Sequence, residues 1–502
     1  LLAFTFAGAL VGLLSSAIIL LFRLLIDSRE LINLLAGLTH PPSWWFAARL
    51  AVGAALLWGI YSLLKTDSRR AGVAHLIERL AQPIARLPLV NMIGQFFGAA
   101  VAIAAGFSVG REGPGVHLGA AAGSQLGLYL GLPNNSLRTL IGCGCAAAIA
   151  ASFNTPLAAV VFTLEVLALD YAVANLAPVL VAAVTGTVMT RLVYGSAPAF
   201  AIPVIDLAGL AGMESLLTLL FLTLLGVVVG VLAALFIQLL EFFSTWQQQA
   251  PRWRRFALAA TGMAIIGSWL PETLGVGYDT VEQTIAGNHL LWGLAAITAG
   301  KIIATALCLG LGIPGGLIGP SMVIGATAGG CFYGLVIMAG GEIGDSASAL
   351  FIMVGMAAMM GATLQAPLSA LTALLEMGQN TQWVLPGMIG IVTACLVSRV
   401  GFGKESVFHQ LLTVRGVSFE TTVMHKTLRE VGVMAAVDPS FELHHHRVDA
   451  ESLERLLGSS VRWLLLHNGQ QPIAAVLRET LVTQIMRAHP DGFPESDEAA
   501  FD

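Results

Sequence analysis

The stretch Phe153-Asn-Thr-Pro-Leu-Ala-Ala-Val-Val-Phe-Thr-Leu-Glu-Val166 returns 211 residues later as Leu364-Gln-Ala-Pro-Leu-Ser-Ala-Leu-Thr-Ala-Leu-Leu-Glu-Met377. The prolines and the glutamates of the two copies align without a gap. A proline suits the first turn of a helix because its missing N–H has no intrahelical partner there anyway. Each copy is therefore expected to be a short helix that starts at the proline and ends near the glutamate.

A second pair of motifs lies ahead of these helices. Gly110-Arg-Glu-Gly-Pro114 and Gly316-Leu-Ile-Gly-Pro320 share a Gly-x-x-Gly-Pro frame at an offset of 206, and each runs into an apolar helix of small residues. The chain thus consists of two related halves, about 1–200 and 201–412. Duplicated halves in membrane transport proteins are commonly related by a pseudo-two-fold axis, with the substrate bound where they meet.

The composition places most of the chain in a membrane. Of 502 residues, 56% are hydrophobic and 11% are charged, against roughly 25% charged in soluble domains, which excludes a soluble globular protein. Residues 404–502 hold 23 of the 55 charged residues. We therefore expect an all-α membrane domain over 1–412, a small polar α/β domain over 413–490, and an acidic, disordered end over 491–502.

Apolar segments of two lengths alternate along the membrane domain. Segments long enough to cross a bilayer fall at about 1–25, 48–64, 174–192, 214–241, 254–270, 290–309 and 382–399. Segments that are too short or too rich in glycine to be simple spans fall at about 92–107, 115–130, 139–151, 156–169, 320–339, 348–363 and 366–377. Interrupted helices at membrane depth are tolerated where protein covers them or where they line a cavity, so the shorter set points to the binding site.

Several functions are disfavoured by what the sequence contains. The net charge of −5 and the pI near 6.1 provide no basic surface for nucleic acid. H-E-x-x-H and G-x-S-x-G signatures with a partner are missing from the apolar region, so we do not expect an enzyme, a metal or a cofactor. The run from His444 to His446 is interpreted as a solvated face. The cysteines are interpreted as buried small hydrophobes: Cys143, Cys145, Cys308, Cys331 and Cys395.

The glycine motifs have the chemistry of an anion site. Gly110 and Gly113 let the backbone approach a ligand closely, and the helix that follows offers unpaired N–H groups and the positive end of its dipole. The stretch Gly316-Leu317-Ile318-Gly319 repeats this arrangement in the second half. Two helix N-termini are therefore expected to converge on one anion. Partial charges suit a transported ion because a full charge in a low dielectric would hold it too tightly.

Charged residues within the apolar domain have alternative interpretations. Glu112 either stabilises its helix start, a contribution of about 0.3–1 kcal/mol, or is a tethered anion that competes with the mobile ion and leaves when protonated. Arg111 is expected to pair with loop carbonyls or carboxylates, with direct contact to the anion as the alternative. Glu165 and Glu376 are expected to pair with nearby donors at the membrane edge. His117 is interpreted as a core histidine, with a proton-carrying role as the alternative.

These motifs together resemble the CLC family of chloride channels and chloride/proton antiporters over nearly all of residues 1–412. Residues 110–114 match the family's GREGP motif in full. Residues 312–320 read GIPGGLIGP where the family typically has G-x-P-G-G-x-F-x-P. Ser152-Phe-Asn-Thr-Pro-Leu157 and Ala366-Pro-Leu-Ser369 support the match. The resemblance implies an inverted repeat of about 18 helices, a homodimer with one pore per subunit in the bacterial inner membrane, a cytoplasmic tail, and Glu112 as the gate.

Three positions depart from the family pattern. The family's first anion motif, GSGIP, falls where this chain has Arg70-Ala71-Gly72-Val73-Ala74, so Ala71 replaces a serine, and Phe408 takes the place of a tyrosine. Neither side chain can donate a hydrogen bond to an anion, which leaves backbone N–H groups, especially those of Leu317 and Ile318. Val166 occupies the position of a proton-passing glutamate.

Chloride is accordingly the expected substrate and passive conduction the expected mode. Chloride/proton exchange, with protons as a second partner, is the alternative, and so is the transport of another anion such as nitrate or fluoride. In the tail, residues 461–467 and 472–477 are expected to be two strands around an Asn468-Gly469 turn, after a helix at 450–457. This stretch resembles a single degenerate CBS module.

Overall fold

The computed structural model describes residues 2–35, 43–65, 69–70, 72–82, 84–169, 172–196, 213–248, 250–340 and 347–417, and in the tail 440–445, 447–448, 461–467, 472–477, 479–480, 483, 487 and 499–500. The chain divides into two compact units, Leu1–Ser418 and Phe419–Asp502. Each unit is described by itself below. Ala71, the Asn468-Gly469 turn and the helix expected at 450–457 lie outside the described residues.

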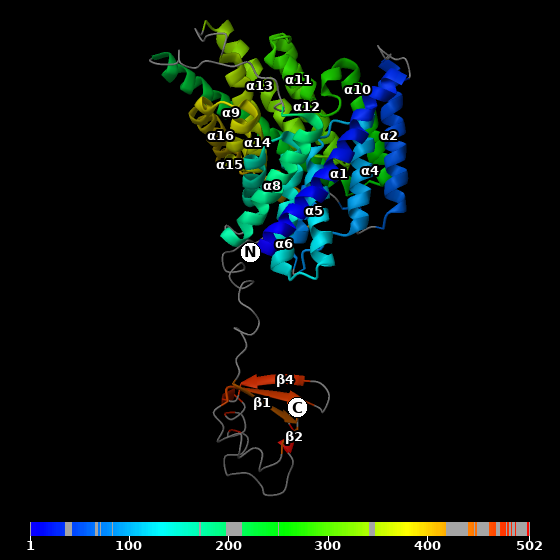
Figure 1. The fold of residues 1–502 in the computed structure, drawn as a ribbon, viewed down its shortest axis with the longest axis vertical. Coiled ribbons are helices and arrows are strands. Elements are labelled where there is room, and N and C mark those ends of the chain that lie inside the picture. Colours follow the sequence, from blue (N-terminus) through cyan, green and yellow to red (C-terminus); the bar gives the residue numbers. More distant parts are fainter. Residues whose placement is uncertain are drawn as a thin grey trace. The chain divides into compact units, whose positions relative to one another are not determined.

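The first unit is a helical bundle (Figure 1). Its first half contains α1 Leu2–Leu35, α2 Ser43–Leu63, α3 Gly72–Ala81, α4 Leu89–Ala105, α5 Glu112–Tyr129, α6 Asn134–Phe153, α7 Pro156–Val166 and α8 Val173–Tyr194. Its second half contains α9 Met213–Gln247, α10 Arg252–Trp269, η3 Pro271–Thr273, α11 Tyr278–Ile285, α12 Leu291–Gly310, α13 Ile318–Met338, α14 Ala347–Leu364, α15 Pro367–Gly378, η4 Thr381–Trp383, α16 Val384–Leu396, η5 Val397–Gly401 and α17 Val407–Val414. The all-α membrane fold expected from the sequence is confirmed.

Three helices are longer than the sequence suggested. Among the described residues, nine helical segments are long and apolar enough to cross a membrane, and α6, α13 and α14 are three of them. The expectation that these segments were too short or too glycine-rich to span is therefore wrong. Helix α6 extends over the polar residues that precede its apolar part, and the glycines of α13 and α14 stay helical because neighbouring helices pack directly on them.

Close glycine contacts explain how these central helices pack. A Cβ built on Gly119 of α5 would lie 2.2 Å from the carbonyl oxygen of Gly144 in α6. A Cβ built on Gly325 of α13 would lie 2.3 Å from the carbonyl oxygen of Gly355 in α14. Small residues let membrane helices approach this closely. The second pair lies 206 and 211 residues after the first, so it occurs at the offsets of the sequence repeat.

The second unit contains a small sheet, described by itself. Its strands are β1 Phe441–His445, β2 Arg447–Val448, β3 Trp463–His467, β4 Pro472–Leu477 and β5 Ala499–Ala500. β3 pairs antiparallel with β4, which confirms the two strands expected there, and β1 pairs parallel with β3. β2 and β5 form a separate antiparallel pair. The sequence interpretation missed β1, whose last residues belong to the histidine run.

The two short proline-initiated helices cap each other. Glu165, at the end of α7, accepts hydrogen bonds from the backbone N–H groups of Leu368 and Ser369 in the first turn of α15, at 3.1 and 2.7 Å. Glu376, near the end of α15, accepts from the corresponding first-turn N–H groups of α7, at 2.9 and 2.8 Å. Each carboxylate thus satisfies helix N–H groups that have no intrahelical partner. The expectation that both glutamates pair with nearby donors is confirmed.

This reciprocal capping predicts a loss of stability in Glu165→Gln and Glu376→Gln. An amide has one acceptor oxygen and no charge, so each variant weakens hydrogen bonds of a charged group, which contribute roughly 1.5–3 kcal/mol. We expect each variant to lower the thermal unfolding midpoint of the detergent-solubilised protein, with Glu405→Gln, at an exposed position, as the control. Midpoints equal to that of the unmodified chain in both variants would contradict the capping role.

Candidate functional site

Two glycine turns, one from each half, meet backbone to backbone at the centre of the membrane unit. Gly110 and Gly316 form an antiparallel bridge in which each N–H donates to the other residue's carbonyl oxygen, at 2.6 and 2.7 Å. The approach requires glycine: a Cβ on Gly316 would lie 2.5 Å from the nitrogen of Gly113, and a Cβ on Gly113 would lie 2.7 Å from the Cα of Gly316. The bridge brings the first turns of α5 and α13 together.

The carboxylate of Glu112 lies at the start of the helix from the other half. Its Oε2 accepts a hydrogen bond from the backbone N–H of Gly319 in the first turn of α13, at 3.2 Å. The side chain is 1% exposed. A negative charge is favoured here by the unpaired N–H groups and by the positive end of the α13 dipole. Glu112 therefore fills, in this structure, an anion position of the kind that the sequence predicts.

Tyr278 holds the other oxygen of the same carboxylate. Its hydroxyl donates to Oε1 of Glu112. The Nε atom of Arg111 lies 3.6 Å from that oxygen, and the Arg111 guanidinium lies 5.1 Å from the centre of the Tyr278 ring. Arg111 thus sits beside a carboxylate, as expected. The sequence interpretation missed Tyr278, the first residue of α11, because it lies 166 residues away from Glu112 in a short segment that no motif marks.

A buried lysine shapes the loop that leads to Tyr278. Lys301 of α12 is fully buried, and its Nζ donates to the carbonyl oxygens of Thr273 and Gly275, at 3.0 and 2.7 Å. The N–H of Gly275 donates in turn to the carbonyl oxygen of Gly106, at 3.0 Å. Lys301 therefore fixes the segment just before α11. Its signal was present in the sequence, because it is the one charged residue in the apolar segment 290–309 and intramembrane charges usually have a role.

A small cavity lies next to Glu112. It measures about 30 Å³, enough for one or two water molecules. Its walls are mainly apolar, and its lining comes from both halves: Glu112, Ile149, Phe153, Thr155, Ala158, Phe162, Ile318, Met322, Met360, Ser369, Ala373 and Met377. The Ser369 hydroxyl donates to Glu165. The cavity therefore lies between the Glu112 carboxylate and a hydroxyl that is bonded to a second carboxylate.

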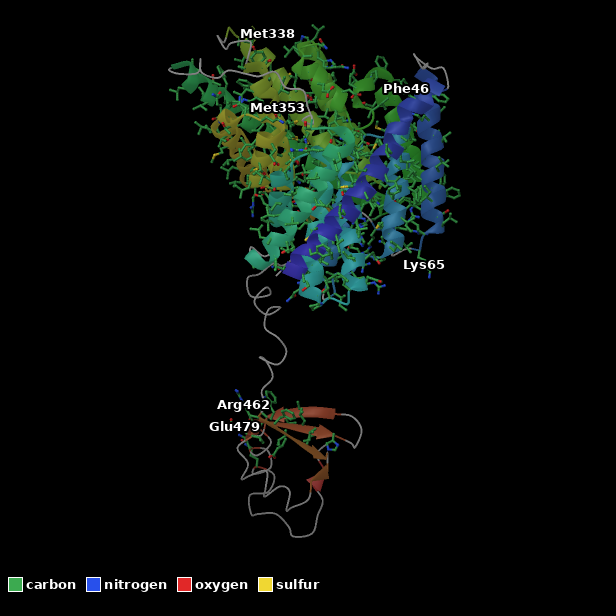
Figure 2. The ribbon with its side chains drawn as sticks, in the orientation of Figure 1. Phe46, Lys65, Met338, Met353, Arg462 and Glu479 are labelled. Carbon is green, nitrogen blue, oxygen red and sulfur yellow. The ribbon has the colours of Figure 1, made fainter. Side chains whose placement is uncertain are left out.

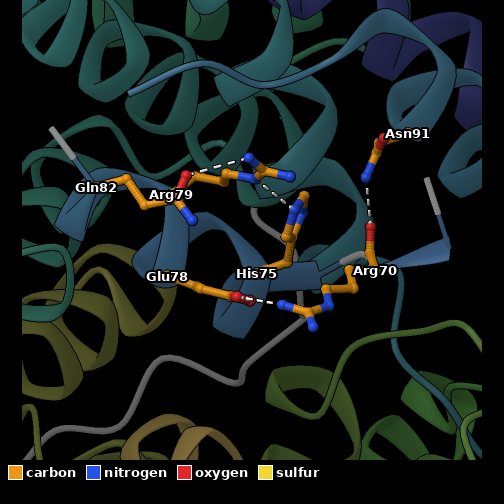
Figure 3. A network of polar contacts seen from close by, with 6 residues as sticks. All are labelled: Arg70, His75, Glu78, Arg79, Gln82 and Asn91. Carbon is orange, nitrogen blue, oxygen red and sulfur yellow. Dashed lines mark hydrogen bonds and ion pairs between the residues drawn. The ribbon is translucent and has the colours of Figure 1, made fainter. Parts of the chain in front are cut away.

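Polar contacts surround α3, involving its own side chains, Arg70 ahead of the helix and Asn91 of α4 (Figure 3). The guanidinium Nε of Arg79 donates to Nε2 of His75, at 3.1 Å. That ring nitrogen must then be an acceptor, so the proton of a neutral His75 is on Nδ1, which lies 3.1 Å from Nε2 of His117. Arg70, which precedes α3, forms an ion pair with Glu78 in the second half of that helix. Both histidines are fully buried, as expected for a core histidine at 117. Among the described residues, however, the Nδ1 atom of His117 is buried without a hydrogen-bond partner, so His117 is not a fully satisfied core histidine and its proton-carrying role stays a prediction.

The remaining predicted residues lie at different places. Leu317 and Ile318 are buried at the start of α13, and Ile318 lines the cavity. Phe408 is buried in α17 and is not among the lining residues of the cavity. Val166 is partly exposed at the end of α7. All five cysteines are free thiols, and four of them are buried.

Known proteins resemble this chain over most of the membrane unit. Residues 52–399 match the family model described as "Voltage gated chloride channel". A ClcB-like chloride channel protein from Ralstonia nicotianae is 30% identical over 381 residues, which cover 74% of this chain and 86% of that protein. An H⁺/Cl⁻ exchange transporter, ClcA, from Vibrio cholerae is 29% identical over 327 residues, which cover 63% of this chain and 68% of that protein.

Solved structures share the fold at lower identity. A slow cyanobacterial Cl⁻/H⁺ antiporter superimposes with a TM-score of 0.72 at 21% identity, covering 84% of this chain and 99% of the antiporter. A eukaryotic CLC transporter superimposes with a TM-score of 0.70 at 18% identity, covering 95% of this chain and 98% of the transporter. The arrangement of helices around the glycine bridge is therefore that of a known transport fold.

Proposed function

The chain belongs to the voltage gated chloride channel (CLC) family, and we propose that it moves chloride across the membrane along a path that the Glu112 carboxylate closes. The observation that carries this proposal is the hydrogen bond from the N–H of Gly319 to Glu112. A carboxylate bound at a helix start occupies a position that suits a chloride ion. When the carboxylate is protonated or moves away, the same N–H groups become available to chloride.

The anion path is proposed to run along backbone groups of both halves. Its residues are Gly110, Arg111, Gly113, Gly316, Leu317, Ile318, Gly319 and Phe408, together with Ala71, which lies outside the described residues and is included from its place in the sequence. Neither Ala71 nor Phe408 has a side-chain donor. In the proposed path, the anion is therefore coordinated by backbone N–H groups and surrounded by hydrophobic side chains. Weak coordination of this kind favours release over retention.

The mode of transport has two candidates. We favour passive conduction because Val166 cannot carry a proton where related exchangers have a glutamate. Chloride/proton exchange is the second candidate. It is supported by the description of the Vibrio cholerae relative as an exchange transporter and by the cavity between Glu112 and Ser369, which has room for water.

The proposed location and oligomeric state follow from the family resemblance. The membrane unit is proposed to lie in a bacterial inner membrane as a homodimer, with one path in each subunit. The polar second unit is proposed to face the cytoplasm. As a single CBS-like module, it is proposed to support packing or dimer stability, because nucleotide sensing in such modules normally requires a pair.

Glu112→Gln tests the closing role directly. In the unmodified protein, chloride flux into proteoliposomes is expected to rise as pH falls, because protonation removes the charge that binds the N–H of Gly319. The variant is expected to conduct at every pH with little pH dependence. Glu282→Gln, at an exposed position of α11, should retain the pH dependence. Loss of flux in a Glu112→Gln protein that is still folded would refute the closing role.

Tyr278→Phe removes one hydrogen bond from the same carboxylate. A hydrogen bond to a charged group contributes roughly 1.5–3 kcal/mol, and one pH unit corresponds to about 1.4 kcal/mol. The pH at which flux is half-maximal is therefore expected to move upward by about one to two units. Tyr129→Phe, at an exposed position near the end of α5, serves as the control. An unchanged pH profile in Tyr278→Phe would mean that the hydroxyl does not stabilise the closed state.

Proton coupling can be decided in one vesicle experiment. Proteoliposomes with a chloride gradient are followed with a chloride electrode and an internal pH dye at the same time. Passive conduction predicts chloride efflux without sustained proton uptake once the membrane potential is clamped with potassium and valinomycin. Steady proton movement opposite to chloride, lost in Glu112→Gln, would establish exchange and reject the passive mode. Protein-free vesicles supply the leak baseline.

A further inference from the structure

An alanine-lined groove opens between α2 and α10, away from the glycine bridge. The two helices pack side by side along one edge of the membrane unit (Figure 1). The groove has a volume of about 440 Å³. Two half-exposed tryptophans, Trp58 and Trp253, belong to its walls. The complete lining is Ala47, Ala51, Ala54, Ala55, Trp58, Trp253, Phe256, Ala257, Ala260, Thr261 and Ala264.

The groove has a strongly basic end. Residues 61–70 and 248–257, which flank it there, contain six Lys and Arg residues and one acidic residue. Arg252 Nη1 donates to the carbonyl oxygen of Tyr61, at 3.1 Å, and so joins the start of α10 to the end of α2. The Arg254 guanidinium lies 5.2 Å from the centre of the Trp253 ring. Lys65 lies at the end of α2 opposite to Phe46 (Figure 2).

These cations have few acidic partners. Among the residues that the structure describes, the salt bridges do not involve Lys65, Arg252 or Arg254. Arg252 also lies within electrostatic range of Arg69. Two neighbouring guanidinium groups repel each other, and a bound anion relieves that repulsion. The basic end is therefore complementary to a negatively charged group.

The length of the groove fits one leaflet of a membrane. Its α2 wall runs from Ala47 to Trp58, which is about 16 Å at 1.5 Å per residue. Half of a ~30 Å hydrocarbon core is about 15 Å. The tryptophans mark the interface end, where such rings are enriched, and the cations lie just beyond them. A crossing helix from another protein would instead contact the full depth of the bilayer and would not require charge at one end.

We propose that this groove binds one anionic phospholipid, with an acyl chain along the alanines and the phosphate at Lys65, Arg252 and Arg254. The lipid belongs to the leaflet at which α17 ends, because Gln248, just ahead of α10, donates to the carbonyl oxygen of Val414 at the end of α17, at 2.5 Å. This proposal does not depend on the transport mode.

Two sets of variants separate the headgroup from the acyl chain. Lys65→Gln with Arg254→Gln removes two charges and leaves Arg252, which links the helices, in place. Ala55→Leu with Ala257→Leu fills the groove at two exposed positions. The matched controls are Arg86→Gln, an exposed arginine before α4, and Ala299→Leu, an exposed alanine of α12 that does not line the groove.

The full chain in detergent is titrated with dioleoyl-phosphatidylglycerol or dioleoyl-phosphatidylcholine, and bound lipids are counted by native mass spectrometry. One phosphatidylglycerol is expected to bind with clear preference over phosphatidylcholine. Each charge removed is expected to weaken binding roughly fivefold, and the leucine pair to remove the bound lipid. The controls are expected to match the unmodified protein.

Other outcomes would overturn the proposal. Equal binding of the two lipids would exclude an anion-selective site, and inorganic phosphate that competes as well as the lipid would exclude a role for the acyl chain. Unchanged phosphatidylglycerol binding in both variant pairs would place the lipid elsewhere. A loss of dimer in the leucine pair, with lipid binding intact, would assign the groove to a second copy of the chain.

Discussion

The pairing of Gly110 with Gly316 constrains everything else in the membrane unit. Two backbones joined by two hydrogen bonds leave no room for side chains between them, so both turns require glycine and both helices must start at the same place. A helix start carries N–H groups without intrahelical partners. Two such helix starts at one point strongly favour a negative charge there. In this structure the Glu112 carboxylate supplies that charge and accepts a hydrogen bond from Gly319.

Other contacts of the membrane unit also occur in matched pairs, one from each half. Glu165 and Glu376 cap each other's helices, and the Gly119–Gly144 contact is repeated by Gly325 and Gly355. Glu165 and Glu376 each bind backbone N–H groups of the other half, whereas each glycine contact joins two helices of the same half. Both kinds of contact recur at the offsets of the sequence repeat. The sequence repeat is thus retained at positions where a backbone contact requires a particular residue.

This explains how far the sequence could predict the structure. Glycines and prolines at matched offsets indicated the halves and the helix starts, since those features depend on local backbone requirements. For Glu165 and Glu376 the sequence indicated pairing with nearby donors, and the structure adds that each carboxylate caps the helix of the other half. The sequence analysis missed Tyr278, the first residue of α11, because its partner Glu112 is distant in the sequence and no motif marks the tyrosine. Lys301 could be seen as a lone charge in an apolar segment, but its partners, the carbonyl oxygens of Thr273 and Gly275, leave no pattern in the sequence. The spans α6, α13 and α14 were underestimated because glycine was taken as a helix interruption, whereas here it permits close packing that protects the helical hydrogen bonds.

The scarcity of charge in the membrane unit has a physical reason beyond solubility in lipid. A fully charged lysine at the bridge would bind chloride strongly in a low dielectric and slow its release, whereas helix N–H groups supply a positive potential of about half a charge. Arg111 lies beside this site, where it contacts Glu112 and Tyr278. The Glu112 carboxylate therefore partly balances its charge. In the proposed opening step, protonation of Glu112 also removes that balancing charge, so that the local potential becomes more positive as the N–H groups become available to an anion.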